Sequence, residues 1–374
     1  MPEGSMTAVP PTPQNPQRMK LAHVLRAIIK ALLLFVAFNL VYRACQPVQT
    51  AQMPTLYNTL VNGRVRLSWG SQIDMAMLLN DHEIQNANPD TWNIAVLGSS
   101  ETYGWPADYR RSAPYVLNAW SLETHEGQPV RVYNLSIPSG DVWKDLMVAE
   151  HLLQSGLPVD LLVFNFYAYS FETDYPHPIV IHNPALARTI LEAYDLDPSW
   201  LAYLPEVGVQ TFWTEREVLA YWLGNQVEAL NWLLAPDTAT KPNAVPLSTH
   251  LEAKNLPITR ADFMQALRKM AEEYHVGVLA INVPRPFAED DFSTWIAVQA
   301  KSNHVALLNC EFVFEPEMFY DDIHMMPTAY LDYASVLIGH LASPEMSRIS
   351  PELPLRVPAD FTPPDEACVF QPAP

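Results

Sequence analysis

Residues 93–105 constrain the fold of this chain more than any other stretch. They begin with a short apolar run, residues 94–97, that is rich in β-branched side chains and ends at a glycine, as is typical of a buried parallel strand. Gly98, Ser99 and Ser100 then follow as a tight turn. A serine just past the carboxyl end of a central strand lies where open α/β sheets bind ligands, and a neighbouring base can make it a nucleophile. Because Gly and Ser are also common in ordinary turns, this stretch alone leaves both interpretations open.

A second motif near the C-terminus supplies the base that such a serine needs. Asp321 and His324 stand three residues apart, just before a helix-like run at residues 328–341. On a turn, a carboxylate at that spacing can accept a hydrogen bond from the imidazole, which leaves the other ring nitrogen free to act as a base. Asp322 is the alternative partner, although its position suits the geometry less well.

Together these motifs resemble those of the SGNH/GDSL hydrolase family, whose first block reads Gly-Asp-Ser and whose last reads Asp-x-x-His. Here Ser99 stands where the family has Asp. The resemblance covers roughly residues 92–341 and implies a three-layer α/β/α sandwich with a mostly parallel sheet. It also implies that Ser100 is the nucleophile, His324 the general base and Asp321 the residue that orients it, with no metal or cofactor.

Two middle blocks of the family carry the oxyanion donors. Residues 132–141 resemble the second block, and Gly140 best matches the glycine that donates a backbone N–H. The third block has an Asn after a buried strand, and Tyr169 stands at that position, with Asn165 four residues earlier as the alternative. The chain therefore predicts a hole formed by the N–H groups of Ser100 and Gly140, and a missing donor can cost about 10²–10³-fold in rate.

The N-terminus predicts a membrane anchor. Residues 1–20 are Pro-rich and polar, which is typical of disorder, and residues 21–43 are long and apolar enough to span a bilayer if their basic side chains extend to the headgroups. The basic residues before the apolar core predict a cytoplasmic N-terminus and an exported main domain. A cleaved signal peptide or a lipoprotein site at Cys45 is the alternative. These basic residues are Arg18, Lys20, Arg26 and Lys30.

The acidic composition of the chain limits the molecules that it is expected to bind. The chain has 22 Lys and Arg residues against 41 Asp and Glu residues, with a formal net charge of −19, which disfavours binding to nucleic acid or to anionic lipid headgroups. The three cysteines have no metal-ligand spacing and reveal no disulfide framework. Cys310 lies in an apolar run, so we expect it in the core.

The sequence pattern divides the rest of the chain into segments. Residues 44–91 form a juxtamembrane lead-in, residues 92–342 alternate strands with helices and so predict a parallel sheet with right-handed crossovers, and residues 171–256 form a helical insertion. The Pro-rich tail at residues 343–374 is not expected to form a core. The expected helices cover residues 112–124, 143–154, 183–194, 214–234, 259–274, 292–302 and 328–341.

The chain is thus predicted to be an exported, membrane-anchored serine esterase or O-acyltransferase, with an acylated envelope glycan as one candidate substrate. Arg285 follows a strand at the same sheet edge as Ser100, where it could meet an anionic substrate. One alternative is a non-catalytic envelope scaffold or glycan-binding protein, which the loss of Asp at Ser99 favours. Another alternative is a membrane-proximal lipase, which is supported by the aromatic residues of the insertion at residues 171–256.

Overall fold

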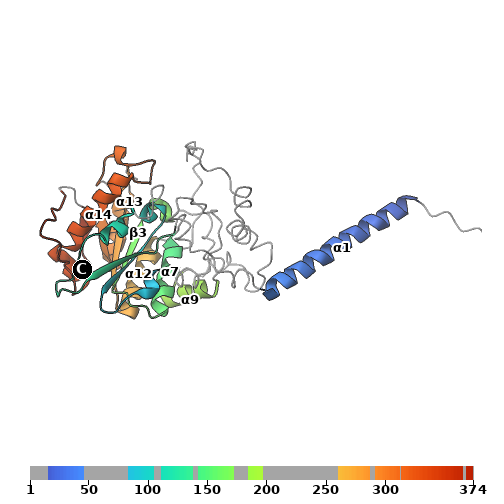
Figure 1. The fold of residues 1–374 in the computed structure, drawn as a ribbon, viewed down its shortest axis with the longest axis horizontal. Helices are drawn as coiled ribbons and strands as arrows, with labels where there is room; N and C mark the ends of the chain where they lie inside the picture. The colour runs from blue at the N-terminus through green and yellow to red at the C-terminus, as the bar shows by residue number, and fades with distance from the viewer. Residues whose placement is uncertain are drawn as a thin grey trace, which may run out of the picture.

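The computed structural model describes most of the predicted domain and the N-terminal helix (Figure 1). The described residues are 16–45, 83–104, 111–137, 142–171, 184–196, 260–286, 291–311, 313–364 and 368–373. Most of the predicted insertion lies outside them, including the expected helix at residues 214–234, and so does most of the lead-in.

The domain is built on one six-stranded sheet in the order β2-β1-β3-β4-β5-β6. Neighbouring strands from β2 to β5 pair in parallel, and β6 joins β5 antiparallel. This confirms the predicted mostly parallel sheet. The strands are β1 (Trp92–Leu97), β2 (Val130–Asn134), β3 (Leu161–Phe166), β4 (Gly277–Asn282), β5 (Ala306–Asn309) and β6 (Val369–Gln371).

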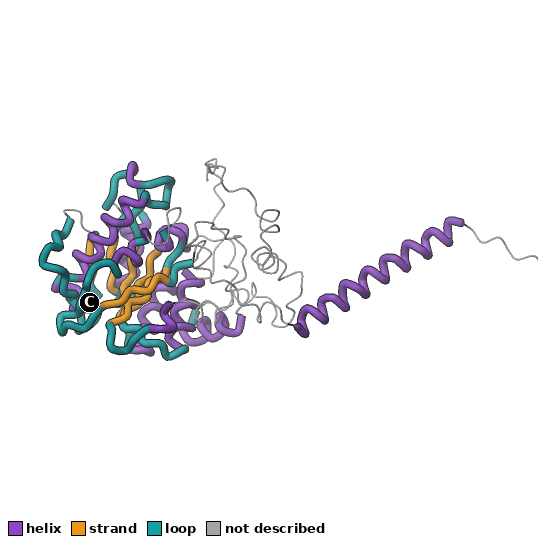
Figure 2. Tube along the Cα trace, viewed as in Figure 1, coloured by secondary structure: helices purple, strands orange, loops and turns teal. Residues whose placement is uncertain are grey.

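Helices cover both faces of the sheet, which gives the predicted three-layer sandwich (Figures 1 and 2). Because side chains alternate along a strand, Ala95 packs into one apolar core with α7, α9, α12 and α13, whereas Ile94 packs into the other with α6 and α14. The helices are α1 (Pro16–Cys45), α5 (Ser100–Tyr103), α6 (Ala113–Leu117), α7 (Val142–Gln154), α9 (Pro184–Tyr194), α12 (Arg260–Tyr274), α13 (Phe292–Ser302) and α14 (Pro327–Leu341). Short 3-10 helices lie at Glu83–Asn86, Ala168–Phe171, Pro316–Met318 and Pro344–Arg348.

The topology marks one place on the sheet for a ligand. β1 pairs with β2 on one side and with β3 on the other, so the order of strands reverses at β1. In open α/β sheets the crevice at such a switch point, outside the carboxyl ends of the strands, is where ligands bind. The turn that carries Ser100 follows β1 directly.

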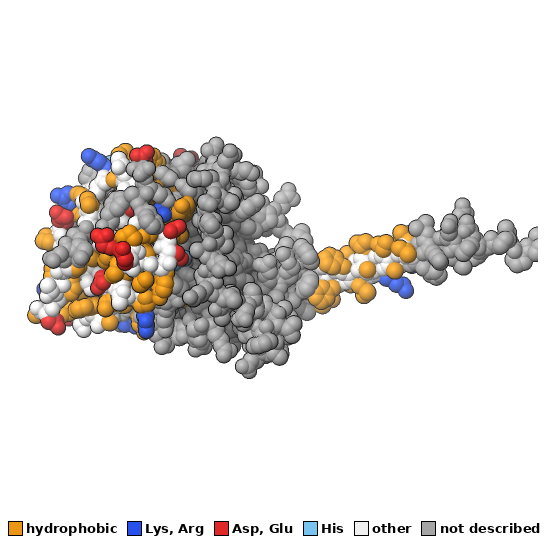
Figure 3. All heavy atoms as spheres, turned by 90° about the horizontal axis from the view of Figure 1, so that it is seen from above, with side chains coloured by type: hydrophobic (Ala, Val, Ile, Leu, Met, Phe, Trp, Pro, Cys, Tyr) orange, Lys and Arg blue, Asp and Glu red, His pale blue; other side chains and the backbone are white. Residues whose placement is uncertain are grey.

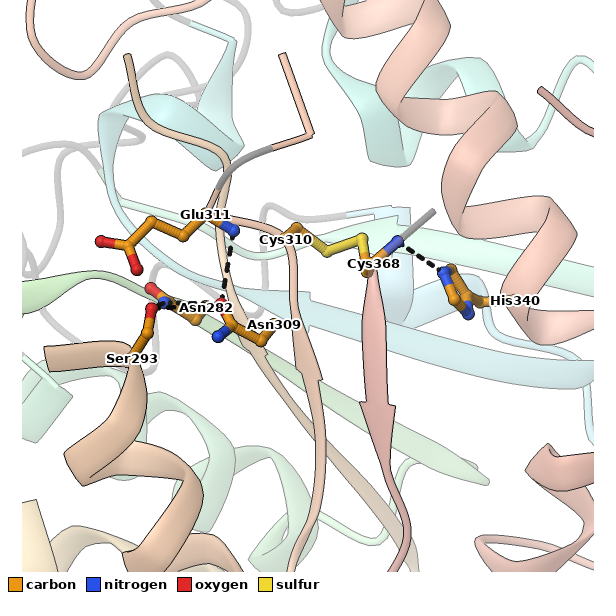
Figure 4. The surroundings of a disulfide bond; sticks show 7 residues. All are labelled: Asn282, Ser293, Asn309, Cys310, Glu311, His340 and Cys368. Atoms are coloured by element: carbon orange, nitrogen blue, oxygen red, sulfur yellow. Dashed lines mark hydrogen bonds between the residues drawn. A yellow bond between two sulfur atoms is a disulfide. The ribbon is translucent and has the colours of Figure 1, made fainter. Parts of the chain in front are cut away.

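The C-terminal tail contributes to the core, contrary to the expectation from its composition. Leu353 and Leu355 are buried in the apolar core under α14. Strand β6 then extends the sheet, and a disulfide joins Cys310, after β5, to Cys368, before β6 (Figure 4). The backbone N–H of Cys368 also donates to Nε2 of His340 on α14, at 2.9 Å. Proline content therefore did not prevent these residues from packing.

Helix α1 has the length and composition of a membrane span. Its segment Val24–Val41 has a mean hydropathy of 2.2, and none of that segment is buried within the structure. Figure 3 shows its described side chains as a largely hydrophobic surface with a basic patch toward its N-terminal end. A signal sequence passes the same test, so the anchor and its orientation stay predictions.

Candidate active site

The turn after β1 depends on a glycine. A Cβ on Gly98 would lie 2.4 Å from the hydroxyl oxygen of Thr102 and 3.0 Å from the Cβ of Asn165, so a larger residue would push these groups apart. This close approach lets α5 begin at the end of the strand. Ser99 caps α5, because its hydroxyl accepts a hydrogen bond from the backbone N–H of Ser100 at 2.6 Å. Ser100 is thereby fixed at the first position of the helix.

The histidine is presented by a tight turn before α14. One carboxylate oxygen of Asp321 accepts hydrogen bonds from the backbone N–H groups of Ile323 and His324, at 2.9 and 2.8 Å. Phe319 and Met325, at the two ends of the turn, form an antiparallel bridge and are both buried. The turn is therefore anchored to the core at both ends, while Asp321 shapes its middle.

Ser100, His324 and Asp321 form one chain of hydrogen bonds, although the serine and the histidine are 224 residues apart in sequence. Nε2 of His324 lies 2.8 Å from Oγ of Ser100, and Nδ1 of His324 lies 2.7 Å from Oδ2 of Asp321. Both distances are within ordinary hydrogen-bonding range. The structure thus brings together the three residues that the sequence predicted as catalytic.

Electrostatics sets the direction of these hydrogen bonds. Burial acts to raise the pKa of Asp321, but the hydrogen bonds from the side chain and backbone of His324 outweigh it, so the pKa lies below its ordinary value. An ionised carboxylate only accepts hydrogen bonds, so Nδ1 of His324 donates to Asp321. In the neutral imidazole, Nε2 is then the acceptor for the Ser100 hydroxyl. The ring donates to Asp321 rather than to the alternative partner, Asp322, and both of these aspartates are exposed.

The predicted oxyanion donors are less well defined. Gly140 lies outside the described residues. The amide of Asn165 is buried and donates to the hydroxyl of Thr102 at 3.0 Å, and the N–H of Ser100 donates to Ser99. Tyr169 is 37% exposed and its ring contacts that of Tyr167. The roles of all four in binding an oxyanion stay predictions.

Arg285 lies beside the two tyrosines after β3. Its guanidinium is 5.5 Å from the ring centre of Tyr167 and 5.1 Å from that of Tyr169, in the range of cation–π contacts. The side chain is only 4% exposed. Burial raises the pKa of Tyr167, and Glu101 adds to this effect while Arg285 opposes it, which places Arg285 in the electrostatic surroundings of the serine turn. Its contact with substrate stays a prediction.

Two buried charged residues next to the serine turn escaped the sequence interpretation. The carboxylate of Glu101 is 1% exposed and accepts hydrogen bonds from the backbone N–H of Ser99, at 3.0 Å, and from the Thr102 hydroxyl, at 3.2 Å. Lys144, on α7, is fully buried and contacts the same turn. Glu101 follows the turn at residues 98–100, and Lys144 follows the block at residues 132–141. Neither position carries a local sequence pattern that distinguishes a buried charged side chain from an exposed one.

Within the described part of the chain, no group of three or more His, Cys, Asp and Glu side chains is arranged to hold a metal ion.

Comparison with known proteins finds distant likenesses among solved structures. The chain matches no family model and no curated protein. The crystal structure of TesA shares 15% sequence identity with it at a TM-score of 0.35, over 70% of this chain and 99% of TesA. A protein assigned to the lipolytic G-D-S-L family from Desulfitobacterium hafniense DCB-2 shares 12% identity at a TM-score of 0.30, over 64% of this chain and 93% of that one. Neither likeness is close enough to support a conclusion about activity.

Proposed function

We propose that this protein is a serine hydrolase of the SGNH type that transfers an acyl group from an ester. The observation that carries this proposal is the hydrogen-bonded chain of Ser100, His324 and Asp321, at 2.8 and 2.7 Å, on a turn at the switch point of the sheet. This arrangement of nucleophile, base and orienting carboxylate is what covalent acyl transfer by serine requires.

The chemistry proceeds in two halves. Oγ of Ser100 attacks the ester carbonyl carbon while Nε2 of His324 takes its proton. The tetrahedral intermediate then expels the alcohol, which receives that proton from His324, and an acyl-enzyme remains. In the second half, water or an acceptor hydroxyl gives its proton to His324 and attacks the acyl carbon. The bond from that carbon to Oγ then breaks, and Ser100 takes the proton back from His324. Throughout, Asp321 stabilises the imidazolium that forms.

The oxyanion needs donors aimed at its developing charge. The N–H of Ser100 is the first proposed donor, because it belongs to the nucleophile itself. It currently donates to Ser99, so the proposal requires that it turn to or be shared with the oxyanion. Gly140 is the second proposed donor, and Asn165 or Tyr169 is the candidate for a third.

A location outside the cytoplasm has two sources of support. One is the apolar helix α1, preceded and interrupted near its start by basic residues, which favours a cytoplasmic N-terminus. The other is the disulfide between Cys310 and Cys368, since such bonds persist mainly in oxidising compartments. A catalytic domain held at the outer face of a membrane would meet acylated glycans, and we propose these as substrates and acceptors.

The test is turnover of a small activated ester, p-nitrophenyl acetate, by the full-length protein in detergent. Wild type should hydrolyse it and Ser100→Ala should not, while Ser335→Ala, which removes an exposed serine hydroxyl on α14, should behave as wild type. Turnover that persists in Ser100→Ala would overturn the assignment. No turnover in any of the three, and no labelling of Ser100 by a serine-directed phosphonate, would favour the scaffold alternative.

A further inference from the structure

Lys144 is a fully buried lysine whose amine meets three oxygen atoms. It donates to the backbone carbonyl of Gly98 and to that of Ile137, both at 2.7 Å, and lies 3.1 Å from a carboxylate oxygen of Asp145. An ammonium group has three N–H donors and no acceptor. Two of its donors therefore bond backbone carbonyls, and a carboxylate lies beside its charge.

The two carbonyls lie where β1 and the chain after β2 separate. Backbone hydrogen bonds still join these segments from Leu135 to Val96, at 2.8 Å, and from Ile137 to Gly98, at 3.0 Å. One residue past Gly98 the chain turns into α5, whose first residue is Ser100. The amine of Lys144 bridges the two segments where they separate, because the Gly98 carbonyl that it binds also accepts the hydrogen bond from Ile137.

An apolar residue at position 144 would remove this bridge between the end of β1 and the chain after β2. A lysine is almost never fully buried unless its charge is paired. Removing its amine would deprive the Ile137 carbonyl of this donor and would take away the cation beside the buried Asp145 carboxylate. A side chain with this cost and these contacts does more than fill space, because its bonds end on the turn that carries the nucleophile.

We propose that Lys144 is a positioning residue for Ser100, an inference that rests on the proposed serine hydrolase function. By holding the Gly98 carbonyl, it fixes the turn two residues before the nucleophile and hence the alignment of the Ser100 hydroxyl with His324. Misplacement of a reacting group by about 1 Å can cost on the order of 10²-fold in rate. The loss should appear in kcat, while KM stays close to the wild-type value because the Lys144 amine is fully buried and bonds the backbone.

The experiment compares variants of the full-length protein with p-nitrophenyl acetate, well below their melting temperatures. Lys144→Met removes the amine, and Lys144→Met/Asp145→Asn also neutralises the carboxylate beside it. Lys144→Arg keeps a cation, but its planar fork places its donors differently. The matched control is Lys269→Met, since the Lys269 amine donates to the backbone carbonyl of Tyr194 at 2.9 Å, on α9 rather than at the serine turn.

We expect kcat to fall about 10- to 100-fold in both Met variants and by a smaller factor in Lys144→Arg, with KM within about twofold of wild type and wild-type kcat in Lys269→Met. If the Met variants do not fold, the reduced kcat of Lys144→Arg decides the matter. Wild-type kcat in every folded Lys144 variant would overturn this inference alone. A wild-type protein without Ser100-dependent turnover would instead overturn the proposed function, and the inference with it.

Discussion

Helix α7 carries a buried charged side chain toward each of its ends, and the two have different consequences. Near its start, Lys144 binds backbone carbonyls of the turn that carries Ser100. Nearly two turns later, Glu150 is 2% exposed and accepts hydrogen bonds from the hydroxyls of Tyr194 on α9 and Tyr274 on α12. One end of the helix thus supports the candidate site, and the other ties three helices together.

This contrast shows that burial of a charge does not by itself identify a functional residue. Both side chains are removed from water at a cost that their partners must offset. What separates them is the group that each one contacts: a backbone turn two residues from a nucleophile in one case, and tyrosine hydroxyls on neighbouring helices in the other. Variants near the site should therefore change kcat, and variants around Glu150 should change the free energy of unfolding.

The largest expected effect is a fall in kcat on substitution within the hydrogen-bonded set Ser100, His324 and Asp321. Asp321→Asn should lower kcat by roughly 10³–10⁴-fold with little change in melting temperature, because the amide favours the wrong histidine tautomer. Asp322→Asn, on the exposed neighbouring residue, is the control and should keep kcat within a few-fold of wild type. Equal losses in the two variants would remove Asp321 from its proposed role, and steady-state kinetics on p-nitrophenyl acetate would show this.

A smaller effect, on stability alone, is expected at the other end of α7. Glu150→Ala should lower the free energy of unfolding by about 2–5 kcal/mol, since it leaves the hydroxyls of the buried Tyr194 and the partly buried Tyr274 without this acceptor. The kcat of the folded protein should stay at the wild-type value. Denaturant titration and steady-state kinetics on the same sample measure both. A large fall in the kcat of Glu150→Ala would contradict the distinction between a site-supporting end and a structural end of α7.

The smallest expected effect is a change in how the stability of the folded protein declines at alkaline pH. Burial and the hydrogen bond to Glu150 raise the pKa of Tyr194, so the folded state holds this proton more tightly than the unfolded chain. Its contribution to stability is therefore complete below about pH 10, the ordinary pKa of tyrosine, and is lost as the pH rises further. Tyr194→Phe should make the decline in stability above pH 10 shallower, as melting temperatures across that range would show. An unchanged slope would contradict this linkage.

Elements that depend on local pattern were predicted well from the sequence. The apolar run before Gly98 is β1, and the expected helix at residues 292–302 is α13. The hydrogen-bonded pairing of Asp321 with His324 was also predicted, because three-residue spacing on a turn is a local property. The contact of that pair with Ser100 required the family resemblance, since no local pattern joins residues so far apart.

Features that depend on distant contacts were missed or misjudged. The helix expected to reach residue 124 ends at Leu117, because the side chain of Asn118 instead bonds both backbone groups of Val132 on β2. The pairing of Cys310 with Cys368 follows from the position of β6 beside β5, which a Pro-rich tail does not reveal. Lys144 was missed for the same reason: α7 is buried along most of its length, so apolar periodicity could not show which charged side chain turns inward.

The most direct test of the central claim is the reaction of the full-length protein with a fluorophosphonate, followed by peptide mass mapping. This reagent reacts with a serine hydroxyl that a neighbouring base activates. The hydrogen bond of 2.8 Å between Ser100 and His324 predicts a single adduct on Ser100, absent from Ser100→Ala and strongly slowed in His324→Ala. A wild-type protein that folds but forms no adduct on Ser100, or an adduct formed equally fast in His324→Ala, would contradict the account.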